Sequence, residues 1–118
     1  MPVAGLVPNR AENTVKPLMY GYMRAPDDVS DGELDRAVSE MQRFAETEGY
    51  CYATTFFEHQ HGSRAAFDEL IQELKRAEAR HVVVPSFEHL SSHRLLCSSM
   101  VERLETHANA FVLTSSGT

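Results

Sequence analysis

The chain has 118 residues, of which 42% are hydrophobic, and its 11 basic and 17 acidic residues give a net charge of −6. This length suffices for one buried core and is too short for two ordinary domains. The basic residues are spread along an acidic chain, which argues against tight binding to a phosphate backbone. No apolar run approaches the about 20 residues needed to span a bilayer. Cys51 and Cys97 lack CxxC spacing, so we expect reduced core thiols in a cytoplasmic protein.

A flexible leader is expected over residues 1–16, because Pro2, Gly5 and Pro8 interrupt a stretch without a hydrophobic period. The folded domain is expected over residues 17–118. There, apolar strand-like runs alternate with amphipathic helices. This alternation predicts an open, mostly parallel four-stranded α/β sheet flanked by helices.

The first strand is expected over Leu18–Arg24, where bulky apolar residues run up to Pro26. Ser30 and Glu33 then have the spacing of a capping box, which marks the start of a helix. Gly49 is expected to end this helix. Its predicted apolar face consists of Leu34, Ala37, Val38, Met41, Phe44 and Ala45.

A second strand is expected over Cys51–Phe57, followed by the polar loop Glu58–Gly62. Ser63 is a suitable N-cap for the next helix. The predicted buried stripe of that helix consists of Phe67, Leu70, Ile71, Leu74 and Ala77.

A short third strand is expected over Val82–Val84, closed by Pro85. A helix from about Ser91 to His107 follows, and Asn109 helps to end it. The fourth strand is expected over Ala110–Thr114. Right-handed crossovers would then bring the loops after the strands to one edge of the sheet. The inward-facing residues of the last helix are predicted to be Leu96, Cys97, Met100, Val101 and Leu104.

The order and spacing of these segments resemble the N-terminal catalytic domain of the resolvase and invertase serine recombinases. The strand Tyr20-Gly-Tyr-Met-Arg24 is similar to the family's aromatic–glycine–tyrosine–x–arginine opening. The segment Phe57–Arg64 is similar to its aspartate, serine-glycine, arginine loop. Residues Val82–Leu90 stand where the family has an apolar strand followed by leucine-aspartate-arginine-leucine-serine-arginine. The resemblance covers Leu18–Thr118 and implies the same fold.

The resemblance also implies a DNA-cleavage reaction, but this chain lacks the oxygen atom that attacks the DNA in that reaction. In the family, a serine hydroxyl attacks DNA and becomes joined to a 5′ phosphate, while arginines stabilise the phosphate charge. Pro26 stands at the position of that serine and has no side-chain oxygen. Removing a nucleophile lowers the rate by about 10⁶ in a serine hydrolase. Ser30 lies nearby, but a capping role would engage its hydroxyl with backbone amides. We therefore assign no catalytic residue.

Five residues form the candidate remnant site or anion-binding site that the resemblance implies. By position, Arg24 and Arg64 match two family arginines, and Glu88 stands at the aspartate. His89 and Ser92 replace two further arginines. The set is Arg24, Arg64, Glu88, His89 and Ser92.

Two of these positions have plainer interpretations. The planar fork of Arg24 suits phosphate or carboxylate, but we favour an ion pair with Asp27, Glu58 or Glu88. Glu88 and His89 have the chemistry of an acid/base pair, because a carboxylate can orient an imidazole that titrates near neutral pH. Such a pair is more often part of a solvated turn.

The histidines allow a metal hypothesis, because His59 and His61 follow the second strand while His89 and His93 follow the third. Zinc takes such imidazoles, with a glutamate as an oxygen ligand. However, His-x-His in a polar loop is common by chance and no cysteine accompanies it. Phosphate-binding motifs of the GxGxxG or GxxxxGK type are also absent from the sequence. We therefore assign no metal and no cofactor.

The sequence thus predicts a catalytically inactive recombinase-like domain that acts by protein–protein interaction or self-association in a regulatory role. A homo-oligomer or a protein partner is expected, and no membrane contact. Helix faces beside the sheet are the expected contact surface, because the chain ends at Thr118, before the family's long helix and DNA-reading domain. One alternative is a recombination or DNA-binding role, for example as a modulator of an intact recombinase. The other is a metal- or anion-binding regulator.

Overall fold

The computed structural model describes residues 16–26, 28–59, 63–91 and 93–115. Within them, strands and helices alternate along the chain. The elements are β1 (Leu18–Arg24), α1 (Asp31–Thr47), β2 (Cys51–Glu58), α2 (Ala65–Ala77), β3 (His81–Val84), the 3-10 turn η1 (Phe87–His89), α3 (Arg94–Ala108) and β4 (Phe111–Thr114). The strands pair in parallel in the order β2-β1-β3-β4. The predicted open, parallel α/β sheet is therefore confirmed. Residues 1–15 of the predicted leader lie outside the described residues.

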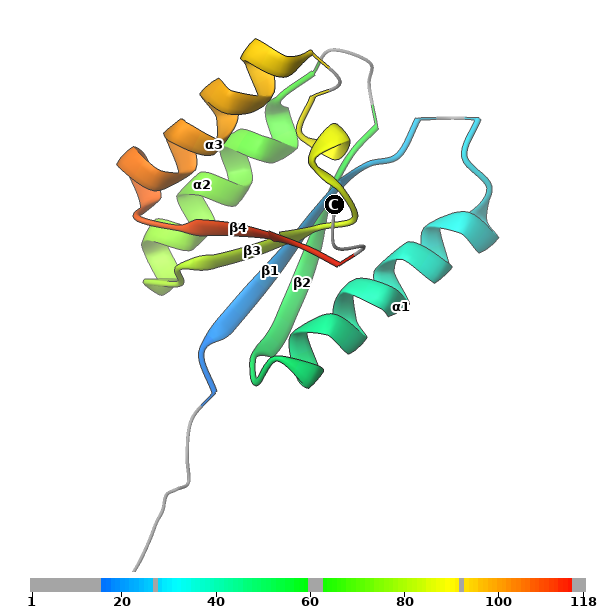
Figure 1. Cartoon of the computed structure of the whole chain (residues 1–118), viewed down its shortest axis with the longest axis horizontal. Helices are drawn as coiled ribbons and strands as arrows, with labels where there is room; N and C mark the ends of the chain where they lie inside the picture. The colour runs from blue at the N-terminus through cyan, green and yellow to red at the C-terminus, as the bar shows by residue number, and fades with distance from the viewer. Residues whose placement is uncertain (1–15, 27, 60–62, 92, 116–118) are drawn as a thin grey trace, which may run out of the picture.

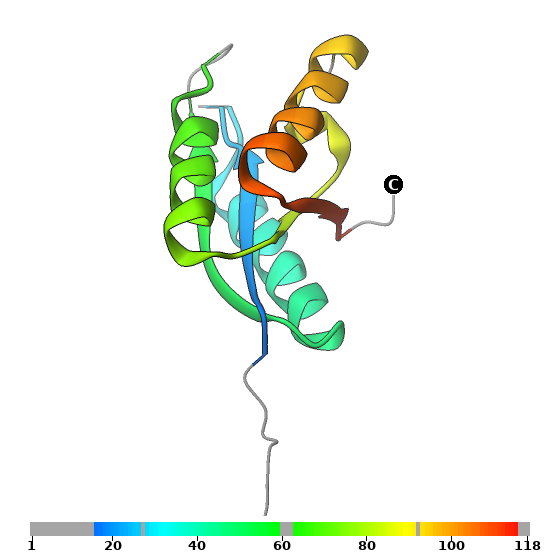
Figure 2. The same cartoon turned by 90° about the vertical axis from the view of Figure 1, so that its left-hand side faces the viewer.

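Helices cover both faces of the sheet, with α1 on one face and α2 and α3 on the other (Figures 1 and 2). Successive residues of a strand point to opposite faces. Accordingly, Met19 and Met23 of β1 pack in the cluster under α1. Tyr20 and Tyr22 belong to the larger cluster formed with α2 and α3. The central strand β1 is buried along almost its whole length, and its last residue, Arg24, reaches the loops at one edge of the sheet.

The predicted capping box starts α1. The Ser30 hydroxyl accepts a hydrogen bond from the Glu33 amide at 3.2 Å, and the Glu33 carboxylate accepts one from the Ser30 amide at 3.1 Å. Together these bonds satisfy two amides that the first turn of a helix leaves unpaired. The helix ends next to Gly49, whose φ of 90° suits glycine. Ser30 therefore caps α1.

The pairing of β1 with β2 is irregular at Gly21. Met19 pairs with Tyr52 but Gly21 pairs with Thr55, so β2 carries one extra residue. This bulge brings the hydroxyls of Tyr52 and Thr55 to 2.5 Å from one another. A Cβ atom on Gly21 would lie 1.9 Å from the Tyr52 hydroxyl oxygen. The absence of a side chain at Gly21 therefore leaves the space that the Tyr52 hydroxyl occupies.

Three sequence predictions need correction. The last helix begins at Arg94 rather than Ser91, because η1 and the residues after it form the turn. Leu96 is 42% exposed instead of facing inward. Cys51 is exposed at the start of the edge strand β2, so it is not a core thiol, whereas Cys97 is half-buried and packs against the core. Among the described residues, no helix is both long and apolar enough to cross a membrane.

Candidate functional site

The carboxyl ends of β1, β2 and β3 point to the same edge of the sheet because the strands are parallel (Figure 1). Arg24 ends β1, Glu58 ends β2, and the turn that contains η1 follows β3. This edge is where open α/β sheets usually bind ligands. The sequence-predicted site residues Arg24, Arg64 and His89 lie around it.

Arg24 joins two of these loops through backbone carbonyls. Its Nε and Nη2 atoms donate to the Leu90 carbonyl at 3.2 and 2.9 Å, and Nη1 donates to the Ser63 carbonyl at 3.3 Å. The predicted ion pair with Glu58 or Glu88 is wrong, because neither carboxylate receives these donors. Asp27, the third expected partner, lies outside the described residues. Arg24 thus stabilises the loops after β2 and β3.

His89 accepts a hydrogen bond from the Arg24 amide at its Nδ1 atom, at 3.1 Å. An imidazole that accepts at Nδ1 is neutral and carries its proton on Nε2. Burial lowers the pKa of His89, Glu88 partly offsets this effect, and the Arg24 charge lowers the pKa further. His89 therefore brings no positive charge at neutral pH to a position where the resemblance places an arginine.

Glu58 caps α2 from the end of β2. It is 4% exposed, and its carboxylate accepts hydrogen bonds from the amides of Ala66 and Phe67 at 3.0 and 3.2 Å. The hydroxyls of Tyr22 and Ser63 also donate to it, at 2.9 and 3.1 Å. Burial alone would raise the pKa of Glu58, but these bonds outweigh it and leave the pKa lowered. The carboxylate is thus an internal anion at the positive end of a helix.

The cap of α2 differs from the sequence prediction. The N-cap residue is Arg64, whose side chain forms no capping bond. Ser63 accepts a bond from the Ala65 amide at 3.2 Å, but Glu58 takes the next two amides. Sequence reasoning missed this role, because Glu58 is outside the local spacing of a cap. The only signal was an acidic residue at the end of a strand shortly before a helix.

Arg64 and Glu88 are exposed side chains near the same edge. Burial and the hydrogen bond to Glu58 raise the pKa of Tyr22. The positive charge of Arg64 lowers this pKa and so offsets part of the rise. Glu88 belongs to η1 and is among the residues that line the hollow along α3. Ser92 lies outside the described residues. Pro26 is exposed, and its carbonyl accepts a turn bond from the Val29 amide at 3.0 Å.

The histidines do not converge in the described part of the chain. The Nδ1 atom of His59 lies 3.2 Å from the Ala25 carbonyl, and its ring stacks on Phe57. His89 is bonded to β1, and His93 is the N-cap of α3. His61 lies outside the described residues. Among those described, no three histidine, cysteine or carboxylate side chains are placed to hold a metal ion.

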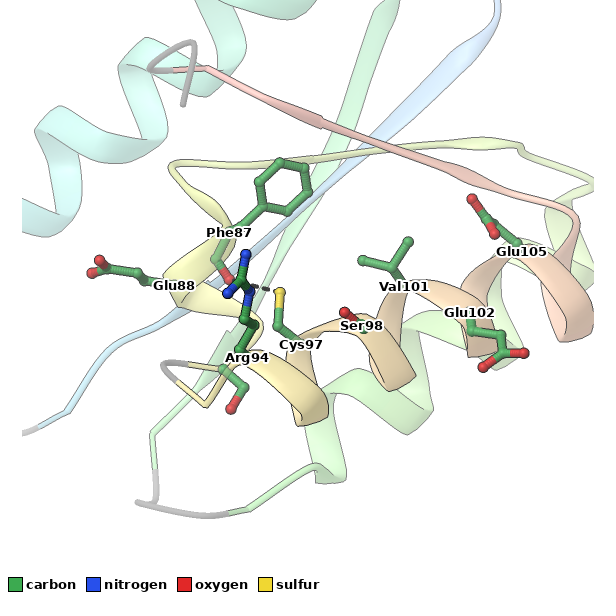
Figure 3. Close-up of a pocket in the computed structure, with 9 residues that line it drawn as sticks. Phe87, Glu88, Arg94, Cys97, Ser98, Val101, Glu102 and Glu105 are labelled. Atoms are coloured by element: carbon green, nitrogen blue, oxygen red, sulfur yellow. Dashed lines mark hydrogen bonds between the residues drawn. The ribbon is translucent and has the colours of Figure 1, made fainter.

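A hollow of about 750 Å³ lies along α3, away from the carboxyl ends of β1 and β2. Phe87 of η1 and Cys97 and Val101 of α3 point into it, and the Cys97 thiol donates to the Phe87 carbonyl at 3.5 Å (Figure 3). We call this surface the α3 groove. Its charged residues are Glu88, Arg94, Glu102 and Glu105.

Comparison with known proteins gives one family and one fold. Residues 19–118 match the family model described as the resolvase N-terminal domain. The crystal structure of the N-terminal catalytic domain of TP901-1 integrase is similar, with a TM-score of 0.66 and 18% sequence identity. The alignment covers 83% of this chain and 76% of that chain. At this identity the likeness shows the fold alone. A search of curated proteins found no match.

Proposed function

The chain belongs to the resolvase N-terminal domain family, and we propose that it is a catalytically inactive member that acts through protein contacts in a regulatory role. One observation carries this proposal. Pro26 stands where the resemblance places the attacking serine, and the adjacent Arg24 directs its guanidinium to the carbonyls of Leu90 and Ser63. A covalent intermediate requires an attacking atom, and a free guanidinium is one of the groups that can stabilise the charge of the phosphoryl group in transfer.

The electrostatics of this edge support the proposal. Helix N-termini bind phosphate through unpaired amides, but Glu58 takes those of Ala66 and Phe67 at the start of α2. An incoming phosphate would therefore meet a buried carboxylate. His89, with its lowered pKa, offers no compensating charge at neutral pH.

Exposed apolar side chains support a role in protein contacts. Phe87 is 41% exposed at the α3 groove, and Leu95 and Leu96 at the start of α3 are 75% and 42% exposed. Apolar surface gathered in one region of a protein marks a site of association more often than scattered single residues do.

A DNA-cleavage assay tests whether the protein is catalytically inactive, as proposed. The wild-type protein is incubated with supercoiled DNA and the products are examined for protein covalently bound to DNA. We expect no adduct from the wild type or from Ser30→Ala. An adduct that forms with the wild type and disappears in Ser30→Ala would refute the proposal, because Ser30 would then be acting as the nucleophile.

The alternative of a DNA-binding modulator has one feature in its favour, the exposed Arg64 at the loop edge of a recombinase-family fold. It predicts retention on DNA that weakens steeply as salt rises. The matched variant Arg64→Ala would reduce that retention. Under the proposal of protein contacts, neither the wild type nor Arg64→Ala is retained on DNA at physiological salt.

A further inference from the structure

The strand β4 has one edge that no other described strand covers. It lies at the end of the sheet, next to β3 (Figure 2). The amides of Phe111 and Ser115 donate toward β3, to the carbonyls of Arg80 and Val84 at 2.7 and 2.9 Å. Because backbone groups alternate in direction along a strand, Val112 and Thr114 direct their N–H and C=O groups away from β3. These groups are suited to bind another extended strand.

The edge of β4 lacks the features that usually prevent such pairing. Residues 110–115 contain no charged residue, proline or glycine. Phe111 is 57% exposed on the same face of the sheet as Leu113. The opposite edge differs, because the bulge in β2 disturbs the regular row of backbone groups there.

We propose that β4 pairs antiparallel with β4 of a second copy of this chain, which joins the two sheets into one. The inference rests on the proposed role through protein contacts and names a surface for it. With Leu113 on the two-fold axis, Val112 stands opposite the partner's Thr114, so both outward amides of each strand find acceptors. Phe111 then lies diagonal to the partner's Leu113 and is covered by it.

Charge and symmetry favour a second copy as the occupant. A two-fold interface places the same patch on both sides, and β4 brings no like charges together because it has none. Helix α3 packs beside β4. The two-fold axis makes the α3 helices of the two copies antiparallel. The end of α3 that carries Arg94 then lies toward the acidic end of the partner's α3. A parallel arrangement would place like charges together. Glu102 and Glu105 lie at the acidic end, and Arg103 between them is paired with Asp68 of α2.

The decisive variant is Thr114→Pro, because Thr114 directs its amide outward and proline is tolerated on an edge strand. It removes an intermolecular donor without touching the bonds between β3 and β4. Sedimentation equilibrium of the full chain should show a dimer for the wild type and about a tenfold or larger increase in the dimer Kd for Thr114→Pro. Circular dichroism checks that the fold is kept. Phe111→Lys, at an exposed position, should also weaken the dimer. It replaces Thr114→Pro as the test if that variant fails to fold.

The control is Gln42→Lys, at an exposed position of α1 on the opposite face of the sheet, and it should dimerise like the wild type. Val101→Glu instead tests the α3 groove. A wild type that stays monomeric at high micromolar concentration would overturn the inference. So would a dimer that Val101→Glu dissociates and that Thr114→Pro and Phe111→Lys leave intact, because the groove would then be the interface. Neither outcome bears on DNA cleavage, so the proposed inactive state is tested separately by the adduct assay.

Discussion

The backbone amide of Arg24 donates to Nδ1 of His89 at 3.1 Å, so the last residue of β1 is bonded directly to the turn after β3. The Arg24 guanidinium reinforces the same contact through the Leu90 carbonyl. A position that the family resemblance assigns to a phosphate-binding cation therefore holds a neutral hydrogen-bond acceptor. Arg24 and His89 of the remnant site are therefore bonded to one another. The contacts at this edge lead to three predictions, and the bulge at Gly21 leads to a fourth.

The first prediction concerns acid sensitivity. The pKa of His89 is lowered in the folded state, mainly by burial, so its contribution to stability is complete above the unfolded value and is lost as pH falls below about 6.5. His89→Asn keeps an acceptor near the Nδ1 position and does not titrate. We expect chemical denaturation to show a shallower loss of stability from neutral to mildly acidic pH in this variant.

The exposed His107→Asn serves as the control for this measurement and should follow the wild type. Some pH dependence should remain in His89→Asn, because burial and the neighbouring Arg80 also lower the pKa of His81. The buried Nδ1 atom of His81 has no hydrogen-bond partner among the described residues. An unchanged slope in His89→Asn would show that His89 is not the sensitive group.

The second prediction concerns Glu58. Glu58→Ala should lower the free energy of unfolding by about 2–4 kcal/mol, because it leaves the Tyr22 hydroxyl and two helix amides without their acceptor. The pKa of Glu58 is lowered in the folded state, so its contribution is present above the unfolded pKa and disappears as pH falls through the folded value. Glu58→Gln should reduce the loss of stability in acid. Glu69→Ala, an exposed site on α2, should change stability by less than about 0.5 kcal/mol.

The third prediction distinguishes a structural Arg24 from an anion-binding one. Arg24→Ala should lower the free energy of unfolding by about 2–3 kcal/mol, since it removes hydrogen bonds from a charged donor to two loops. Arg24→Lys should also be destabilised, because lysine lacks the planar fork. Inorganic phosphate should leave the Tm of the wild type unchanged. A phosphate-dependent rise in Tm that Arg24→Ala abolishes, without loss of basal stability, would contradict this role.

The fourth prediction concerns Gly21. Gly21→Ala should cost about 1–3 kcal/mol, because the new methyl group displaces the Tyr52 hydroxyl from Thr55. In a Tyr52→Ala background the same substitution should cost much less, and the double-mutant cycle measures this coupling. Gly32→Ala is the matched control. A Cβ there meets nothing within 4 Å, and the change should stabilise α1 by up to about 1 kcal/mol.

The sequence was sufficient to predict the strands, the helices and the Ser30 cap, because hydrophobic period and cap spacing are local patterns. It could not predict the partners of Arg24 and Glu58. The Leu90 carbonyl reaches Arg24 only because β1 and β3 are neighbours in the sheet, and charge alone favoured a carboxylate. Glu58 caps α2 across a loop. Leu96, in the first turn of α3, is 42% exposed although it has the spacing of the buried Met100 and Leu104.

The extra residue of β2 also limits how large an assembly of this protein can become. A sheet with two regular free edges can add chains at both ends and grow into a filament. Here the kinked edge of β2 opposes growth on one side. If β4 pairs with a second copy, the one regular edge is occupied, and growth by strand pairing stops at two chains.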